Sequence, residues 1–272
     1  MRCRARRRTS TSFLAAFLAA LIAGGTGVFA AAADLRIETR VYETAEETLV
    51  NESVTCFQAG AVYDFRPAAK RVTIFRAAVG DSPSRFLLLD TEREQFTEIA
   101  ASQITATMTK LRRWAAAQDD PFLRFTGAPR FEESFDAESG ELRMASDQLT
   151  YRIITEPLKH PEVNLELRAF LDGFAQLHTL VEAGLPPEPR LRVNEALFRH
   201  RVIPLQVELT ARDDEEPSLR AEHVVDWVLS KQDRMKIDRS ADQLASFQKV
   251  SNAEFHKGRR QLASVADRGA HK

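Results

Sequence analysis

The chain has 272 residues, with 38 basic and 39 acidic side chains, so its formal net charge at pH 7 is −1. Residues 1–33 hold five of the arginines and no acid, and without them 33 basic and 39 acidic residues leave a net charge of −6. An acidic chain without a cluster of Lys or Arg argues against a nucleic-acid-binding protein. The 30 arginines against 8 lysines favour a bacterial source with a GC-rich genome.

The N-terminus has the three parts of a secretory signal peptide. Residues 1–8 (MRCRARRR) are basic, the apolar run Phe13–Ala23 follows, and a run of small residues ends at Ala33. Cleavage after Ala30 or after Ala33 fits the small side chains that the peptidase requires. The alternative is an uncleaved anchor helix, which needs about 20 apolar residues and is weakened here by three glycines. We therefore predict an exported protein, periplasmic or extracellular, that begins near Asp34 and spans no membrane after cleavage.

Alternating apolar residues predict short antiparallel strands in the first half of the mature chain. These strands are expected at residues 35–41, 54–66, 71–76, 85–89 and 95–99. Gly60 lies inside the second run, where we expect a bulge or bend that leaves Phe57, Tyr63 and Phe65 on one face. Turn residues separate the later runs, which is typical of an antiparallel meander.

Two main helices are predicted farther along the chain. The first spans residues 102–118; after it come a short apolar segment (121–125), a hairpin (130–135 with 141–146) and a strand (149–153). The second spans residues 160–184 and carries an apolar stripe from Val163 to Val181 in steps of three and four. Two strands follow at residues 203–209 and 219–229. The sequence after Ser230 is again helical and ends in a polar tail, residues 258–272, for which we expect disorder.

These elements predict a single α+β domain over residues 34–257. We expect a curved, mainly antiparallel sheet with two main helices packed on it and a helical C-terminal end. No internal repeat and no long Gly/Ser-rich linker divides this segment.

The usual catalytic and cofactor motifs are absent: G-x-S-x-G, H-E-x-x-H, G-x-x-x-x-G-K and G-x-G-x-x-G. We therefore expect no catalytic residue, no metal and no cofactor. His223 lies on the apolar face of a predicted strand, where it is either a proton carrier or metal ligand, or a core histidine with one hydrogen-bond partner. Cys56, the only cysteine after residue 33, is either a reactive thiol or a small buried hydrophobe.

The order of strand-rich sequence in Gly60–Phe75 (GAVYDFRPAAKRVTIF), then Phe86–Ile99 and a helix, resembles the periplasmic carriers of outer-membrane lipoproteins and their half-barrel relatives. The resemblance covers residues 34–155. It implies a curved antiparallel sheet, lidded by helices, that holds acyl chains, and it implies no particular functional residue. The chain departs from this family by lacking a helix before the first strand and by continuing well beyond residue 155.

A concave sheet face that helices fill only in part commonly forms an apolar pocket. The candidate ligand-binding residues are the aromatic side chains Phe57, Tyr63, Phe65, Phe122, Phe125 and Trp227. We therefore expect a non-catalytic binding or carrier protein for an apolar, lipid-like ligand, either a small molecule or a lipidated protein. Two alternatives remain open: a structural or interaction protein of the cell envelope, and a hydrolase with a site near His223.

Overall fold

The computed structural model describes residues 34–257, except residues 46, 183 and 213. The predicted signal peptide and the predicted tail lie outside the described residues. The strands are β1 (Leu35–Glu43), β2 (Thr48–Gln58), β3 (Ala61–Arg66), β4 (Arg71–Arg76), β5 (Arg85–Asp90), β6 (Gln95–Ala100), β7 (Glu132–Asp136), β8 (Glu141–Ala145), β9 (Leu149–Pro157), β10 (Val202–Ala211), β11 (Leu219–Asp226) and β12 (Gln248–Lys249). The helices are α1 (Ala101–Ala116), α2 (Pro121–Gly127), the short 3-10 helix η1 (Pro161–Val163), α3 (Asn164–Glu182), α4 (Glu188–His200) and α5 (Lys231–Ser246). Among the described helices, none is long and apolar enough to span a membrane.

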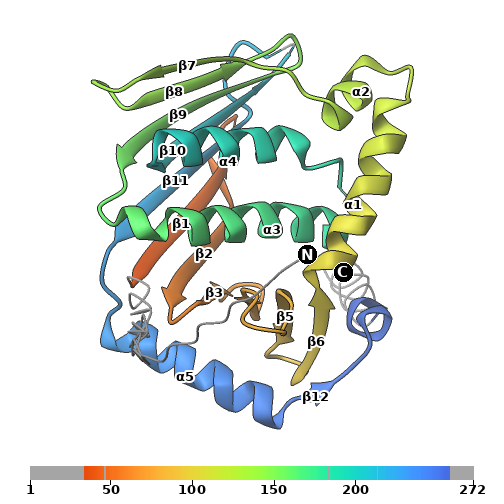
Figure 1. Ribbon diagram of the computed structural model, residues 1–272, viewed down its shortest axis with the longest axis vertical. Helices are drawn as coiled ribbons and strands as arrows, with labels where there is room; N and C mark the ends of the chain where they lie inside the picture. Colours follow the sequence, from red (N-terminus) through yellow and green to blue (C-terminus); the bar gives the residue numbers. More distant parts are fainter. Residues whose placement is uncertain (1–33, 46, 183, 213, 258–272) are drawn as a thin grey trace, which may run out of the picture. The chain divides into compact units, whose positions relative to one another are not determined.

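All these strands join one sheet in the order β12-β6-β5-β4-β3-β2-β1-β11-β10-β9-β8-β7 (Figure 1). Neighbouring strands are antiparallel except β12, which runs parallel to β6. The sheet is strongly curved and unclosed, because its two ends are formed by β12 and β7, which do not pair with each other. The predicted α+β class with a curved, mainly antiparallel sheet is therefore confirmed.

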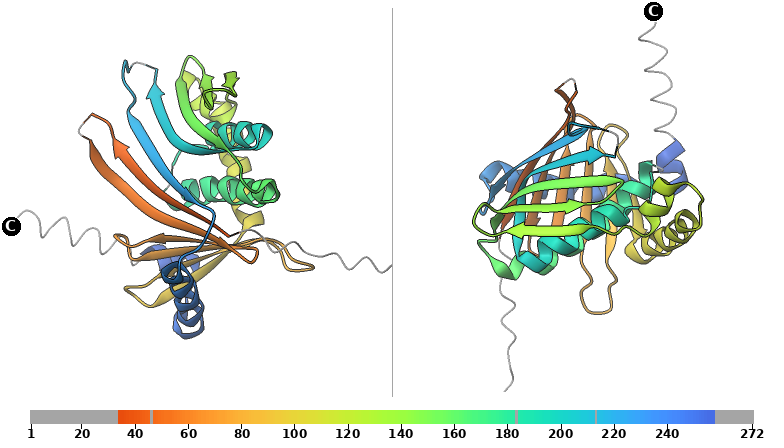
Figure 2. Two further views of the ribbon diagram at one scale, coloured as in Figure 1. Left: turned by 90° about the vertical axis from the view of Figure 1, so that its left-hand side faces the viewer. Right: turned by 90° about the horizontal axis from the view of Figure 1, so that it is seen from above.

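The helices divide between the two faces of the sheet (Figure 2). On the concave side, α1 and α3 pack over the half formed by β1–β6, and α4 packs over the half formed by β8–β11. On the convex side, α5 covers β2–β5 through Ile237 and Leu244. The strands β2–β5 thus lie between two helical layers.

The burial of β5 on both faces explains its unbroken apolar sequence. Phe86 and Leu88 face the concave side and α3, whereas Leu87 and Leu89 face the convex side and α5. Because successive residues of a strand point to opposite faces, a strand covered on both sides needs an apolar residue at every position.

One predicted strand is a hairpin. The run from Val54 to Arg66 is divided into β2 and β3 by a turn at Ala59 and Gly60, both of which have positive φ angles (51° and 75°). Two such residues form the tight connection that suits the twist of a hairpin. We expected a bulge or bend at Gly60 within one continuous strand; the chain does change direction there, but it reverses completely and forms two paired strands. Ala59 hides this turn in the sequence, because alanine rarely adopts that conformation.

Two helices are present that the sequence did not predict. The segment 121–125 begins α2, whose first turn is capped by Asp120 accepting a hydrogen bond from the backbone N–H of Leu123 at 2.8 Å. The helix α4 begins directly after Pro187 and has Pro189 in its first turn, where a proline costs little because that N–H has no intrahelical partner.

Candidate functional site

The six aromatic residues predicted to bind a ligand do not line one cavity. Phe57 faces the concave side, is fully buried and packs edge-to-face on Phe170 of α3, with ring centroids 5.5 Å apart. Tyr63 and Phe65 lie on the convex face under α5, with centroids 6.4 Å apart. The turn at Ala59–Gly60 places Phe57 and Tyr63 on opposite faces of the sheet, because Phe57 is paired with Val62 across the turn and Tyr63 is the next residue along β3.

The other three aromatic residues lie at separate places. Phe122 and Phe125 belong to α2, where Phe122 is 37% exposed and Phe125 packs edge-to-face on Phe131 at 5.4 Å. Trp227 follows β11, lies 5.3 Å from the ring of His160, and lines an open surface cleft of about 660 Å³ with charged neighbours.

The space between α3 and the concave face of the sheet is filled by side chains. A Cβ at Gly173 of α3 would approach the Cζ of Phe86 to 2.9 Å, so the helix backbone lies directly on the aromatic layer of the sheet. Phe75 and Phe86 pack with centroids 4.9 Å apart in the same layer. An acyl chain therefore has no preformed channel between this part of α3 and the sheet.

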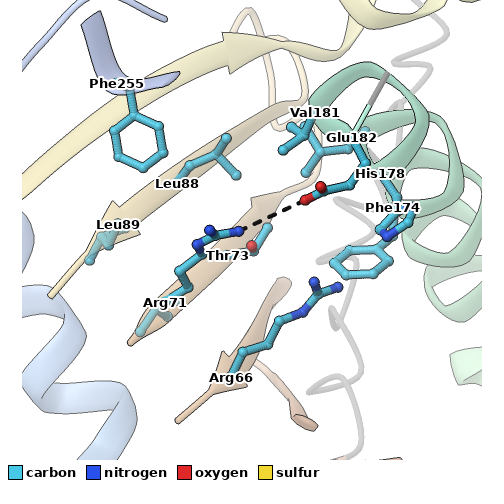
Figure 3. A pocket seen from close by; sticks show the side chains of 12 residues that line it. Arg66, Arg71, Thr73, Leu88, Leu89, Phe174, His178, Val181, Glu182 and Phe255 are labelled. Atoms are coloured by element: carbon cyan, nitrogen blue, oxygen red, sulfur yellow. Dashed lines mark ion pairs between the residues drawn. The ribbon is translucent and has the colours of Figure 1, made fainter. Parts of the chain in front are cut away.

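A small cavity lies near the C-terminal end of α3, where the helix meets β4 and β5 (Figure 3). Its volume is about 40 Å³, close to the roughly 30 Å³ that one water molecule occupies in the liquid. Its apolar lining consists of Val72, Leu88, Leu89, Phe174, Leu177, Val181 and Phe255. The guanidinium groups of Arg66 and Arg71 point from the sheet towards α3 at the rim of this cavity.

These two arginines occupy equivalent positions on paired strands. Arg66 ends β3, Arg71 begins β4, and the two are directly opposite in the register. The turn between them, residues 67–70, is too short to separate their side chains, and both point to the concave face. The chain therefore holds two guanidinium groups side by side at the open end of an apolar space.

Each arginine has one anionic neighbour and one contact with α3. Arg66 Nε donates to Asp64 Oδ2 at 3.1 Å, and its guanidinium lies 5.1 Å from the ring centroid of Phe174. Arg71 Nη1 lies 3.9 Å from Glu182 Oε1, which is long for an ion pair. Partial burial and the charge of Arg66 lower the pKa of His178, so this side chain is neutral at pH 7 and adds no charge at the rim.

Asp64 holds Arg66 in place through a hydrogen bond. Its carboxylate is buried, and it accepts hydrogen bonds from Thr55 Oγ1 at 3.0 Å and from Arg66. Burial raises the pKa of Asp64, while Arg66 and the hydroxyl donors oppose that rise. An acid held in this way fixes the orientation of Arg66, which lies two residues farther along the same face of β3.

A larger, basic cleft lies on the other side of the same arginines. It has a volume of about 250 Å³ and separates the β3–β4 turn from α5. Its lining residues are Phe65, Arg66, Pro67, Lys70, Arg71, Val72, Thr91, Lys236, Arg239, Ser240 and Gln243. This cleft is not apparent from the sequence, because its cations come from two segments far apart in the chain. Only the spacing of Arg66, Lys70 and Arg71 around one turn hinted at it.

His223 does not form a recognisable catalytic site. Its Nδ1 lies 2.9 Å from Thr39 Oγ1, and its Nε2 is buried without a hydrogen-bond partner among the described residues. Burial, with a smaller effect of Arg190, lowers the pKa of His223 to about 4, which makes it a weak base at neutral pH. Within residues 34–257, as far as they are described, no group of three His, Cys, Asp or Glu side chains could hold a metal ion.

Cys56 is completely buried on the convex face of β2. Burial raises the pKa of its thiol to about 12. Because the reactive species is the thiolate, this cysteine behaves as a small hydrophobic residue.

Comparison of the chain with protein-family models and with curated proteins gave no match. The assignment of a function therefore depends on the geometry of the site formed by Arg66, Arg71 and the apolar residues beside them.

Proposed function

We propose that the chain is a non-catalytic binding protein for an amphipathic ligand with an anionic end. The observation that carries the proposal is the pair Arg66 and Arg71 at the rim of an apolar cavity under α3. A guanidinium group matches a carboxylate or phosphate through two parallel hydrogen bonds. The apolar part of such a ligand gains roughly 25 cal/mol per Å² that it buries, before the cost of ordering it.

Binding of an acyl chain requires side chains at the end of α3 to move, because the cavity holds only about 40 Å³. Phe174 and Val181 are the side chains best placed to move, since both are partly exposed at the cavity wall. Gly173, in contrast, is pressed against Phe86 and keeps the middle of the helix in place. We infer that the ligand enters beside the last two turns of α3.

The predicted signal peptide and the resemblance to periplasmic lipoprotein carriers favour a role outside the cytoplasm. A carrier must take up and release its ligand without chemical change. Among the described residues that line the cavity, no hydroxyl or thiol is hydrogen-bonded to a base that could activate it as a nucleophile. We propose on these grounds that the protein carries its ligand and does not transform it.

An interaction protein of the cell envelope is the second candidate. Two exposed apolar side chains near the end of β11 favour it: Val224 is 55% exposed and Val228 is 69% exposed. A protein of this kind would need no ligand under α3, so a ligand titration separates the two proposals.

The test is a calorimetric titration with laurate, using methyl laurate as the uncharged comparison. We expect saturable binding of laurate, with affinity about tenfold or more lower in Arg71→Met, because a hydrogen bond to a charged group is worth roughly 1.5–3 kcal/mol. The matched control is Arg76→Met, at the exposed opposite end of β4, which should bind laurate like the unmodified protein. Absence of laurate binding up to millimolar concentration, with the protein folded, would refute the proposal and favour the interaction protein.

A further inference from the structure

The basic cleft between the β3–β4 turn and α5 has a one-sided charge. Of its lining residues, five are cations and none is an acid. Lys70 comes from the turn, and Lys236 and Arg239 come from α5. Arg66 and Arg71 flank the turn and border the cleft, but their guanidinium groups point to the concave face, towards α3. Most protein surfaces mix the two signs of charge, so a concave site lined by one sign alone attracts ligands of the opposite sign.

Neighbouring carboxylates neutralise only part of this charge. Three of the cations pair with acids that do not line the cleft, at N–O distances of 3.1 Å for Arg66 with Asp64, 2.7 Å for Lys70 with Glu92 and 3.9 Å for Arg71 with Glu182. Lys236 and Arg239 form no ion pair with any described residue, although Glu38 and Asp233 lie close enough to feel the charge of Lys236. The cleft therefore has two cations, Lys236 and Arg239, that no ion pair with a described residue engages.

The cations from α5 are held in position by the packing of the helix. Lys236, Arg239, Ser240 and Gln243 are three or four residues apart, so they share one face of α5. The helix starts with a capping box in which Ser230 and Asp233 bond each other's backbone N–H groups, and Ile237 anchors it on the sheet. This packing fixes the backbone that carries Lys236 and Arg239, whose side chains are exposed.

We propose that this cleft binds a phosphate monoester group. A phosphate monoester carries between −1.5 and −2 charges at pH 7 and has three acceptor oxygens, so it can engage Lys236 and Arg239 together. A carboxylate carries only one negative charge and therefore attracts these two cations less strongly. The volume of about 250 Å³ lies below the roughly 300–1,000 Å³ of pockets that enclose a drug-sized ligand, which suits a head group.

The phosphate would be the anionic end of the amphipathic ligand proposed above. This step rests on the proposed function. Arg66 and Arg71 line both the apolar cavity and the basic cleft. A phosphate in the cleft would thus lie beside the arginines that border the apolar space. The same chemistry is offered by the head group of phosphatidic acid and by a free phosphate compound.

The test measures binding of two phosphate sources at pH 7. Inorganic phosphate is titrated by calorimetry, and vesicles of phosphatidylcholine with and without phosphatidic acid are tested by co-sedimentation. We expect Arg239→Glu and Lys236→Glu each to weaken phosphate binding about tenfold or more, since each replaces an attractive charge by a repulsive one. Lys231→Glu is the matched control, because it makes the same change on the same helix outside the cleft.

Phosphate binding that these two variants weaken and the control does not would support the proposal. Vesicle binding that also requires phosphatidic acid would assign the phosphate to a lipid, whereas phosphate binding without vesicle binding would assign it to a soluble compound. Failure of both sources to bind, or equal weakening by Lys231→Glu, would overturn the proposal. Inorganic phosphate has no apolar part, so a failure of phosphate to bind would not affect the prediction that laurate binds. Circular dichroism checks that each variant is folded.

Discussion

Acidification should destabilise this protein through His223. The imidazole lies on the concave face of β11, with Nδ1 at 2.9 Å from Thr39 Oγ1 of β1 and Nε2 buried without a partner among the described residues. Burial disfavours the charged ring, and the cation of Arg190 adds to this effect. The folded protein therefore binds this proton more weakly than the unfolded chain does.

The sign and size of the change in stability with pH follow from the pKa of His223 in the folded and in the unfolded chain. The pKa of His223 is about 4 in the folded state, against 6.5 for an ordinary histidine, and a difference of this size corresponds to about 3 kcal/mol. The stability from a neutral His223 is complete above pH 6.5, and it is lost as the pH falls from 6.5 towards 4, where the unfolded chain binds more protons. Most of the loss should be present at pH 4.5.

The assay is urea unfolding at pH 7.5 and pH 4.5 of the unmodified protein and of His223→Gln. Carboxylates such as Asp64 titrate in both proteins, so the comparison isolates the histidine. We expect the unmodified protein to lose about 2–3 kcal/mol more of its free energy of unfolding than the variant over this range. Equal losses in the two proteins would show that His223 titrates normally and is not desolvated.

Three further predictions concern the core and the N-terminus. Phe170→Ala should cost about 3–5 kcal/mol in urea unfolding because its ring is 3% exposed, whereas Leu165→Ala, at 70% exposure on the same helix, should cost within about 0.5 kcal/mol; equal midpoints would mean that α3 presents a different face. Gly173→Ala should cost about 1–3 kcal/mol because its Cβ would meet a buried ring at 2.9 Å, and a neutral effect would place α3 farther from the sheet. Exported protein should begin between Ala31 and Asp34 by N-terminal sequencing, and an intact Met1 on membrane-bound protein would favour the anchor helix.

Residue periodicity was sufficient to predict most of the sheet. The alternation at residues 35–41 and 71–76 and the unbroken apolar run at 85–89 correspond to β1, β4 and β5. The apolar stripe predicted in the second long helix includes Leu167, Phe170 and Leu177, which are buried in α3. These elements are predictable because their burial repeats with the period of the backbone.

The errors arose where local sequence and tertiary packing disagree. Ala59 takes a left-handed conformation that the sequence does not suggest, so one strand was expected in place of β2 and β3. Three prolines obscured the start of α4, although two of them precede the helix and the third lies in its first turn, where the helix tolerates it.

The candidate site itself depends on tertiary structure. The rim arginines face the concave side only because β3 and β4 pair in a particular register. The cations of α5 lie on the other side of the β3–β4 turn, because that helix packs on the convex side of β2–β5. An aromatic surplus in the sequence predicted an apolar ligand, but it could not separate the two faces of the sheet on which those rings lie.

The most direct test is a structure of the protein with laurate bound. We expect the laurate carboxylate within hydrogen-bond distance of Arg66 or Arg71, and the acyl chain between Leu88 of β5 and the last two turns of α3, with Phe174 displaced. Laurate bound elsewhere on the protein, with Phe174 and the cavity of about 40 Å³ unchanged, would contradict the assignment of this site.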